Sequence, residues 1–291
     1  METTPKPFTI GQCATLACVL EATAPKPGNV HRGADFEDLT LEDLVASAVA
    51  IGPAMDAAAE QGVGATILAA IRATRRAVAT NTNLGTVLLL GPLAKVPRHV
   101  PLESGIVEVL SSLGPEDARD VYEAIRRAAP GGLGRVDRHD VAGPPPADLM
   151  VAMRDAAGRD MIARQYVEDF RHVLGRAVPW LREGLESGRR LARAVVHVQM
   201  RLMAEHPDSL IARKCGPTVA QEASARAAAV LACGGPGDDN YERALADFDF
   251  WLRSDGHRRN PGTTADLIAA ALFVGLRDGW IDTRRGMREE G

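Results

Sequence analysis

The sequence predicts an all-α protein: a single multi-helix globular bundle whose polar, glycine- and proline-containing loops converge on one pocket. Apolar residues recur at the three- and four-residue spacing of a buried helix face through most of the 291-residue chain. Aromatic residues make up only 4% of the chain, and alternating β-branched runs bounded by turn signals are scarce. We therefore expect a helical content well above the roughly 30–35% of an ordinary globular protein, with no substantial sheet.

The helices can be placed in order from these patterns. The first runs from about Thr9 to Ala24 and stops before Pro25, because a proline disfavours helical backbone in the residue before it. The second covers Leu41 to Gln61 and follows T-L-E-D, which begins at Thr40 and has the form of a capping box. Further helices are expected over residues 64–79, 84–96, 101–113, 115–129, 146–173, 176–186, 189–206, 216–233, 238–254 and 263–278.

The segment 130–146 is the strongest break in the helical pattern, because it contains G-G-L-G and then G-P-P-P. It fits either a linker between two helical halves or an ordered loop over a site. Its five charged or ionisable residues exceed what a passive spacer requires: Arg135, Asp137, Arg138, His139 and Asp140. We therefore expect one domain over residues 1–291, with this loop crossing its middle.

Bulk charge and hydropathy exclude several kinds of partner. The chain has 34 Lys and Arg against 38 Asp and Glu, and a net charge of -4 provides no field that attracts nucleic acid or an anionic membrane. The amino terminus does not have the form of a signal peptide, and no apolar stretch approaches the 18 or more residues of a membrane span. We expect a cytoplasmic protein without nucleic-acid or membrane partners. Its oligomeric state is left open, a homodimer included.

The first candidate site is the polar stretch from Glu21 to Asp38, which joins the first two helices. Two prolines stiffen it, and glycines such as Gly28 permit close approach of the backbone. Its cations and carboxylates are the groups that bind phosphate, hold a hydrated metal and move a proton. The alternative interpretation is a solvated connection between helices.

Two later segments repeat this design. The stretch N-T-N-L-G-T from Asn81 precedes an apolar helix, whose buried first N–H groups need partners that a phosphate would supply. Simple capping by Asn81 or Asn83 is the alternative. In R-R-N-P-G-T-T-A-D, Asp266 lies in the first turn of another apolar helix, where an unpaired carboxylate is costly unless a metal or ligand contacts it. We expect the loops around Lys26, Asn81 and Asp266 to meet at one pocket.

Two other charged groups have a structural explanation. Asp160 and Arg164 are four residues apart, so an ion pair on one helix is the favoured interpretation. Arg213 and Lys214 form a charged junction between helices.

These segments resemble one known family. E-A-T-A-P-K-P-G-N-V-H-R-G-A-D-F-E-D, from Glu21, is similar to the amino-terminal signature of triphosphoribosyl-dephospho-CoA synthases. N-T-N-L-G-T resembles the family's Asn-Thr-x-x-Gly loop, and N-P-G-T-T-A-D-L-I-A-A resembles its Pro-Gly-x-x-Ala-Asp-Leu segment. Asn83 and Leu84 replace the usual His-Lys pair, which removes a phosphate-binding cation, and Asp35 stands where a histidine often occurs. The middle of the chain resembles a divergent, archaeal-type branch.

The resemblance implies an all-helical enzyme that transfers the triphosphoribosyl group of ATP to a ribose hydroxyl of dephospho-CoA and releases adenine. The product is the precursor of the prosthetic group of citrate and malonate lyase-type acyl carriers. The implied partners are therefore ATP and dephospho-CoA, or a related coenzyme precursor, together with magnesium.

Displacement of adenine needs a carboxylate near the sugar, a base for the acceptor hydroxyl and a proton for adenine. As a hypothesis, His31, Asp35 and Glu21 are catalytic, and Glu37 and Asp38 hold Mg²⁺. The expected nucleotide-binding residues are Lys26, Gly28, Asn29, Arg32, Asn81, Thr82, Asn83, Gly262 and Asp266. Three alternatives remain open: another coenzyme-precursor acceptor, a magnesium-dependent hydrolase of nucleotides or ADP-ribose, and a non-catalytic nucleotide-binding protein.

Overall fold

The structure, a computed structural model that describes residues 7–131 and 134–282, is 67% helical and confirms the all-α prediction. Within these residues the only strand is the isolated four-residue segment β1 (Ser254–His257). The first half contains α1 (Ile10–Thr23), α2 (Leu41–Asp56), the 3₁₀ turn η1 (Ala57–Ala59), α3 (Val63–Ala77), α4 (Leu84–Lys95), α5 (Leu102–Ser111) and α6 (Pro115–Ala128). The second half contains α7 (Leu149–Ala156), α8 (Met161–Val167), the π-helix η2 (Val173–Ala177), α9 (Val178–Glu186), α10 (Leu191–Glu205), α11 (Ser209–Cys215), α12 (Pro217–Ala232), α13 (Asp239–Arg253) and α14 (Gly262–Arg277).

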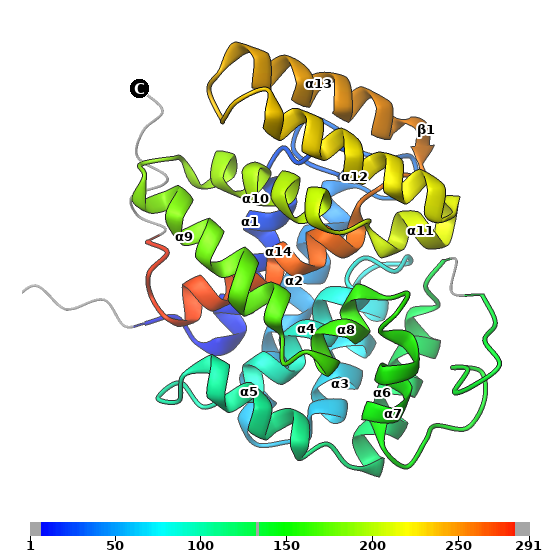
Figure 1. The fold of residues 1–291 in the computed structure, drawn as a ribbon. Helices are drawn as coiled ribbons and strands as arrows, with labels where there is room; N and C mark the ends of the chain where they lie inside the picture. The colour runs from blue at the N-terminus through cyan, green and yellow to red at the C-terminus, as the bar shows by residue number, and fades with distance from the viewer. Residues whose placement is uncertain (1–6, 132–133, 283–291) are drawn as a thin grey trace, which may run out of the picture.

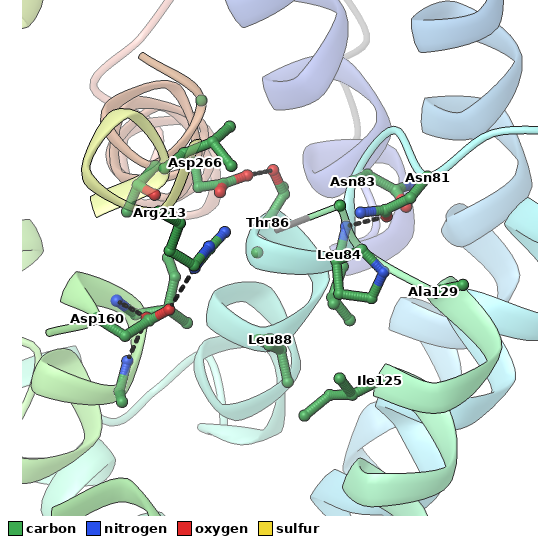
Figure 2. A pocket seen from close by; sticks show the side chains of 18 of the residues that line it. Asn81, Asn83, Leu84, Thr86, Leu88, Ile125, Ala129, Asp160, Arg213 and Asp266 are labelled. Atoms are coloured by element: carbon green, nitrogen blue, oxygen red, sulfur yellow. Dashed lines mark hydrogen bonds and ion pairs between the residues drawn. The ribbon is translucent and has the colours of Figure 1, made fainter. Parts of the chain in front are cut away.

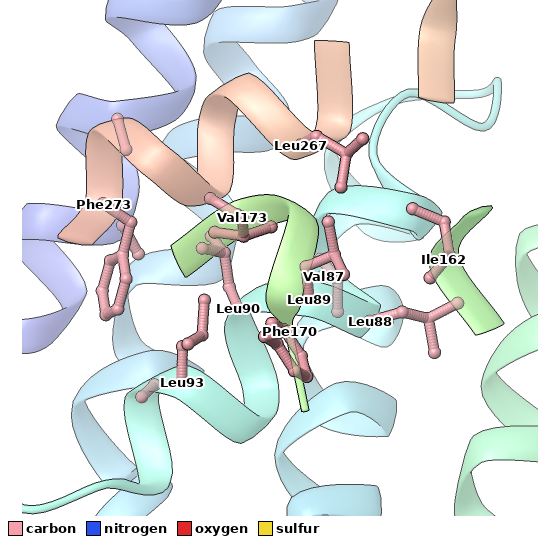
Figure 3. Packing of buried hydrophobic residues seen from close by; sticks show 14 of the residues in the cluster. Val87, Leu88, Leu89, Leu90, Leu93, Ile162, Phe170, Val173, Leu267 and Phe273 are labelled. Atoms are coloured by element: carbon pink, nitrogen blue, oxygen red, sulfur yellow. The ribbon is translucent and has the colours of Figure 1, made fainter. Parts of the chain in front are cut away.

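Two apolar helices, α4 and α14, form the centre of the fold and pack against each other (Figure 1). Ten of the 12 residues of α4 are buried, and so are 13 of the 16 residues of α14. Both helices begin at a polar loop, so their amino ends bring polar backbone into the interior. Figure 3 shows the side chains of this core, which include Val87, Leu89, Leu90, Phe170, Val173, Leu267 and Phe273.

The buried helix α4 contains a proline that its surroundings accommodate. Pro92 has no N–H, so it cannot donate to the carbonyl of Leu88, four residues earlier. The hydroxyl of the fully buried Tyr166, on α8, donates to that carbonyl at 2.6 Å. This bond attaches α8 to α4 and leaves the carbonyl of Leu88 satisfied.

A second hydrophobic cluster lies between α10, α12 and α13, which are drawn at the top of Figure 1. Helix α10 contributes side chains to both clusters, since Val195 lies in the central core and Met203 in the second cluster. None of the helices within the described ranges is long and apolar enough to cross a bilayer.

The caps that the sequence predicts at the first two helices are present. Helix α1 ends at Thr23, with Ala24 in extended conformation before Pro25. At α2, the Thr40 side chain accepts from the backbone of Asp43, whose carboxylate in turn accepts from the backbone N–H of Thr40. The capping box is therefore confirmed.

Two expectations about the second half were wrong. The single helix expected over 146–173 is divided into α7 and α8, because Asp160 ends a turn and caps a new helix by accepting from Ile162 and Ala163. The helix α11 was missed. Its seven residues are too few to show a periodic pattern, and its cap, Asp208, was not recognised as one.

Candidate functional site

A cavity of about 720 Å³ lies where the amino ends of α4 and α14 meet α11 and the connection between α6 and α7. This volume is typical of a site for a small molecule of nucleotide size. Residues from all three predicted loops line it: Glu21, Asn29 and Asp38 from the first, Asn81 to Thr86 from the second, and Asn260, Gly262 and Asp266 from the third. Figure 2 shows Thr86 between Asn81 and Asn83 on one side and Asp266, Arg213 and Asp160 on the other.

Asp266 is the best-defined polar group of the cavity. It lies in the first turns of α14, and its Oδ1 accepts a 2.6 Å hydrogen bond from the hydroxyl of Thr86, in the first turn of α4. Burial raises the pKa of Asp266 to about 8, and the negative charge of Glu21 acts in the same direction. The Thr86 hydrogen bond opposes this rise. The carboxyl is therefore mostly protonated at neutral pH, and it faces the cavity.

Gly85 allows this close approach between α14 and α4. A Cβ at position 85 would overlap the Asp266 carboxylate and lie 2.6 Å from its Cγ. We therefore expect Gly85→Ala to displace Asp266 and to destabilise the protein by about 1–3 kcal/mol, the usual cost of overpacking. The clash should outweigh the gain of roughly 1 kcal/mol from helix propensity.

Urea unfolding of this variant checks the prediction. Gly131→Ala is the matched control, because a Cβ there would meet no atom within 4 Å. A Gly85→Ala protein as stable as wild type would show that the two helices can separate without cost.

Lys26 lies behind the cavity, where it supports the Glu21 side chain. Its side chain is fully buried, and its ammonium forms a 2.8 Å ion pair with Glu21 Oε1 and also donates to the Glu21 carbonyl. Glu21 lines the cavity, whereas Lys26 does not. The structure therefore does not place Lys26 where the sequence suggested, against a triphosphate.

The Pro-Lys-Pro-Gly-Asn stretch is held largely by α10 and α13, two helices of the second hydrophobic cluster. Gly28 has φ 73°, and its N–H donates to Asp249 on α13 at 2.7 Å. Asn29 donates to Asn260 at 2.6 Å and accepts from the buried Gln199 of α10 at 3.0 Å. Asn29 is thereby oriented on the cavity wall, whereas Gly28 packs against Leu252 and Pro261 and acts through the backbone.

The next part of this loop lies mostly away from the cavity. His31 accepts from the N–H of Gly33 through Nδ1, and burial lowers its pKa. Asp35 accepts from the N–H of Leu41 at 2.8 Å, at the start of α2. Arg32 and Glu37 are exposed, and of the five residues assigned sites between 31 and 38 only Asp38 lines the cavity, with Oδ1 3.0 Å from His257 Nδ1.

The second loop follows the prediction at Asn81 to Asn83, all of which line the cavity. Asn81 Oδ1 accepts from the N–H of Leu84, so the predicted capping interaction is present together with the cavity position. The Thr82 hydroxyl lies 2.5 Å from that of Ser47, on α2. Asn83 donates to Thr74 at 3.1 Å, and its Oδ1 has no hydrogen-bond partner among the residues that the structure describes.

Several cavity residues were not predicted from sequence as part of the site. Asp160 does not pair with Arg164. It accepts from Arg213 of α11 at 2.6 Å, whereas Arg164 donates to the carbonyl of Ala157. Arg213 and its neighbour Lys214 both line the cavity. Arg213 and Asp160, the N-cap residue of α8, are 53 residues apart, so no local pattern in the sequence predicts that they meet.

The connection between α6 and α7 also reaches the cavity, through residues that include Arg135, Arg138 and His139. Tyr122 donates to the carbonyl of His139 at 2.8 Å, and the His139 ring lies 2.8 Å from Asp155 on α7. Residues 132 and 133 of the predicted loop lie outside the described residues. The described remainder is attached to the helices at both ends and borders the cavity.

The fold and the cavity together define an all-helical protein with an internal polar site of nucleotide size. A family model for ATP:dephospho-CoA triphosphoribosyl transferases matches residues 7–285, and the chain belongs to this family. The fold is also similar to the crystal structure of an Archaeoglobus fulgidus protein assigned as a triphosphoribosyl-dephospho-CoA synthase. That comparison has a TM-score of 0.63 and 26% sequence identity, and it covers 81% of this chain and 100% of the other. No curated protein sequence gives a significant match.

Proposed function

We propose that this transferase moves the triphosphoribosyl group of ATP to a ribose hydroxyl of dephospho-CoA and that the reaction takes place at the Asp266 cavity. The family match supports the reaction. The observation that supports the location is the meeting of all three family-like loops at one cavity, which is lined by the largely protonated carboxyl of Asp266.

The reaction breaks the bond between C1′ of ribose and N9 of adenine and forms a bond between C1′ and the acceptor oxygen. Positive charge develops on the sugar during this displacement, and a carboxylate beside it is stabilising. Glu21 is suited to that task, because Lys26 holds its carboxylate at the cavity wall. Asp266, protonated at neutral pH, is suited to give a proton to the leaving adenine. The proton lost by the acceptor hydroxyl balances the one that adenine takes.

In this proposal the catalytic residues are therefore Glu21 and Asp266, and not His31 and Asp35. Neither His31 nor Asp35 lines the cavity, and the Asp35 carboxylate is used at the start of α2. Glu21 and Asp266, two of the carboxyl groups that do line it, differ in environment, since Glu21 is paired with a lysine and Asp266 bonds to a threonine hydroxyl. Such a difference is how two carboxyl groups acquire opposite roles in one site.

The apolar part of the cavity is suited to the adenine base. Leu84, Leu88 and Ile125 lie together on one wall, next to Asn81 and Asn83 (Figure 2). A purine has two apolar faces and a polar edge, so this wall can cover the base while an amide reads its edge. We assign Asn81, Thr82 and Asn83 to nucleotide orientation on this basis.

Magnesium would be held mainly by the substrate. Glu37 does not line the cavity, and no three His, Cys, Asp or Glu side chains converge as a metal site within the described residues. Mg²⁺ in nucleotide sites usually needs only one or two protein carboxylates beside the phosphates. Asp38 is the carboxylate of the predicted pair that fits, and the ion would neutralise phosphate charge there.

Incubation of the purified protein with ATP, Mg²⁺ and dephospho-CoA tests the proposal, with adenine measured by liquid chromatography. We expect adenine release that depends on dephospho-CoA. Release without any acceptor would indicate a hydrolase that uses water. Release with another coenzyme precursor and not with dephospho-CoA would keep the chemistry and change the acceptor.

A further inference from the structure

The cavity is lined by basic side chains that have no role in the proposed reaction so far. Five arginine and lysine residues line the cavity in the described part of the chain: Arg135, Arg138, Arg159, Arg213 and Lys214. Arg213 and Lys214 are adjacent in the last turn of α11. Cations are favourable at the carboxyl end of any helix, so position alone does not make them a site. What indicates a site is the hydrogen-bond partners of these two residues and their burial.

Arg213 is fixed in orientation but only partly satisfied. Its Nη1 donates to Asp160 Oδ2 at 2.6 Å, while Asp160 Oδ1 accepts from two N–H groups at the start of α8. If the Arg213 guanidinium moved, the Asp160 carboxylate could follow it only by giving up its hydrogen bonds to the first N–H groups of α8. A guanidinium has five N–H donors, and the buried Nε of Arg213 has no hydrogen-bond partner among the described residues. Figure 2 shows the side chain extending from α11 along the cavity.

Arg213 has Asp160 as an ion-pair partner, whereas Lys214 has no such partner among the described residues. Its side chain is partly buried at the cavity and forms no hydrogen bond or ion pair with the described residues. Burial lowers the pKa of its ammonium, and the charge of Asp38 acts in the opposite direction. A partly desolvated ammonium without a partner is unfavourable, and a bound anion would restore its interactions.

The acidic side chains of the cavity do not cancel this positive charge. Asp266 is mostly protonated at neutral pH. The carboxylate of Asp140 interacts with the positive charge of Arg135. The other three carboxylates already have a basic partner within 3.0 Å: Glu21 with Lys26, Asp38 with His257, and Asp160 with Arg213. Arg138 is paired with Asp155 at 3.6 Å. Lys214 and Arg159 are left without a carboxylate partner among the described residues.

We propose that Arg213 and Lys214 form a polyphosphate-binding subsite that takes the triphosphate of ATP. This inference rests on the proposed function, and it supplies the phosphate-binding cations that the Asn83-Leu84 loop lacks. In Figure 2, Arg213 lies on the same side as Asp266, across Thr86 from the apolar wall assigned to adenine. Ribose carries the base on C1′ and the triphosphate on C5′, so a nucleotide that spans from the apolar wall to Arg213 has its sugar near Thr86 and Asp266.

Isothermal titration of wild type and Lys214→Gln with ATP, adenosine, inorganic tripolyphosphate and dephospho-CoA tests the subsite. Lys214→Gln is chosen because no protein partner is lost with the charge. We expect its Kd for ATP and for tripolyphosphate to rise at least about tenfold, while that for adenosine stays the same. Lys214→Arg should recover most of the affinity. Arg243→Gln, which removes an exposed cation from α13, is the matched control and should bind like wild type.

Unchanged Kd values for ATP and tripolyphosphate in a folded Lys214→Gln protein would overturn the proposal. So would a loss confined to dephospho-CoA, which would assign the subsite to the diphosphate of the acceptor. Measurement of adenine release distinguishes a failure of the subsite proposal from a failure of the proposed function. A wild type that releases adenine, with variants that bind ATP normally, refutes the subsite alone. A wild type that binds tripolyphosphate through Lys214 but releases no adenine refutes the proposed function alone.

Discussion

Asp266→Asn should lower adenine release by about a hundredfold or more, the usual scale for loss of a general acid. The substitution keeps the size of the side chain and an oxygen that can accept from Thr86, but it removes the acidic proton. In wild type, the rate should fall as the pH rises through about 8, because Asp266 loses its proton there. Initial rates between pH 6 and 9 check both statements.

The same substitution should stabilise the fold. The pKa of Asp266 is raised from 3.8 to about 8 in the folded protein, so between these values the folded state holds a proton that the unfolded state has lost. The stability associated with this group is fully present below pH 4 and decreases as the pH rises towards 8, by up to about 1.4 kcal/mol per pH unit. Asp266 is partly exposed, so solvent screening reduces the total loss of stability across this range.

Asparagine does not titrate, so the free energy of unfolding of Asp266→Asn should exceed that of wild type by a margin that grows from pH 5 to pH 8. Urea unfolding at several pH values measures it. Asp247→Asn, an exposed position on α13, is the control and should show no such margin. A margin independent of pH would mean that Asp266 is ionised in the folded protein, and the acid role would be lost with it.

Lys26→Met should destabilise the protein by about 3–5 kcal/mol, because it leaves the largely buried carboxylate of Glu21 without its cation. For a chain of this size the melting temperature should fall on the order of 10 °C. Methionine keeps most of the volume of the lysine stem, so the loss reports the charge and not a cavity. Calorimetry of the single variant measures the effect.

The double variant Lys26→Met/Glu21→Gln distinguishes the pair from other causes. Removal of both charges should recover much of the lost stability, whereas catalysis should stay impaired because the carboxylate is gone. Direct contact of Lys26 with the triphosphate predicts a different outcome. In that case Lys26→Met would weaken ATP binding about tenfold with little change in melting temperature, and the position of Lys26 behind the cavity would be wrong.

The sequence allowed prediction of those features that have local causes. The capping box at Thr40 and the end of α1 before Pro25 follow from neighbouring residues alone. The meeting of the three loops could be expected because α4 and α14 are apolar on all sides, which places their polar starts inside the protein.

The features that escaped prediction depend on contacts between distant residues. Lys26 was assigned to phosphate because cations and rigid prolines coincide in one stretch, whereas the structure buries its ammonium against Glu21. Asp160 had a local partner in Arg164, but the structure pairs it with Arg213. The orientation of a side chain toward or away from a cavity has no signature in the spacing of residues, and six of the nine site residues assigned in the first loop do not line the cavity.

Mass spectrometry of the acceptor is the most direct test of the central claim, that the Asp266 cavity carries out triphosphoribosyl transfer. Wild type, incubated with ATP, Mg²⁺ and dephospho-CoA, should convert the acceptor to a product heavier by one triphosphoribosyl group, in amounts equal to the adenine released. Asp266→Asn should form almost none while remaining folded. Unmodified dephospho-CoA with wild type, or equal product with Asp266→Asn, would contradict the account.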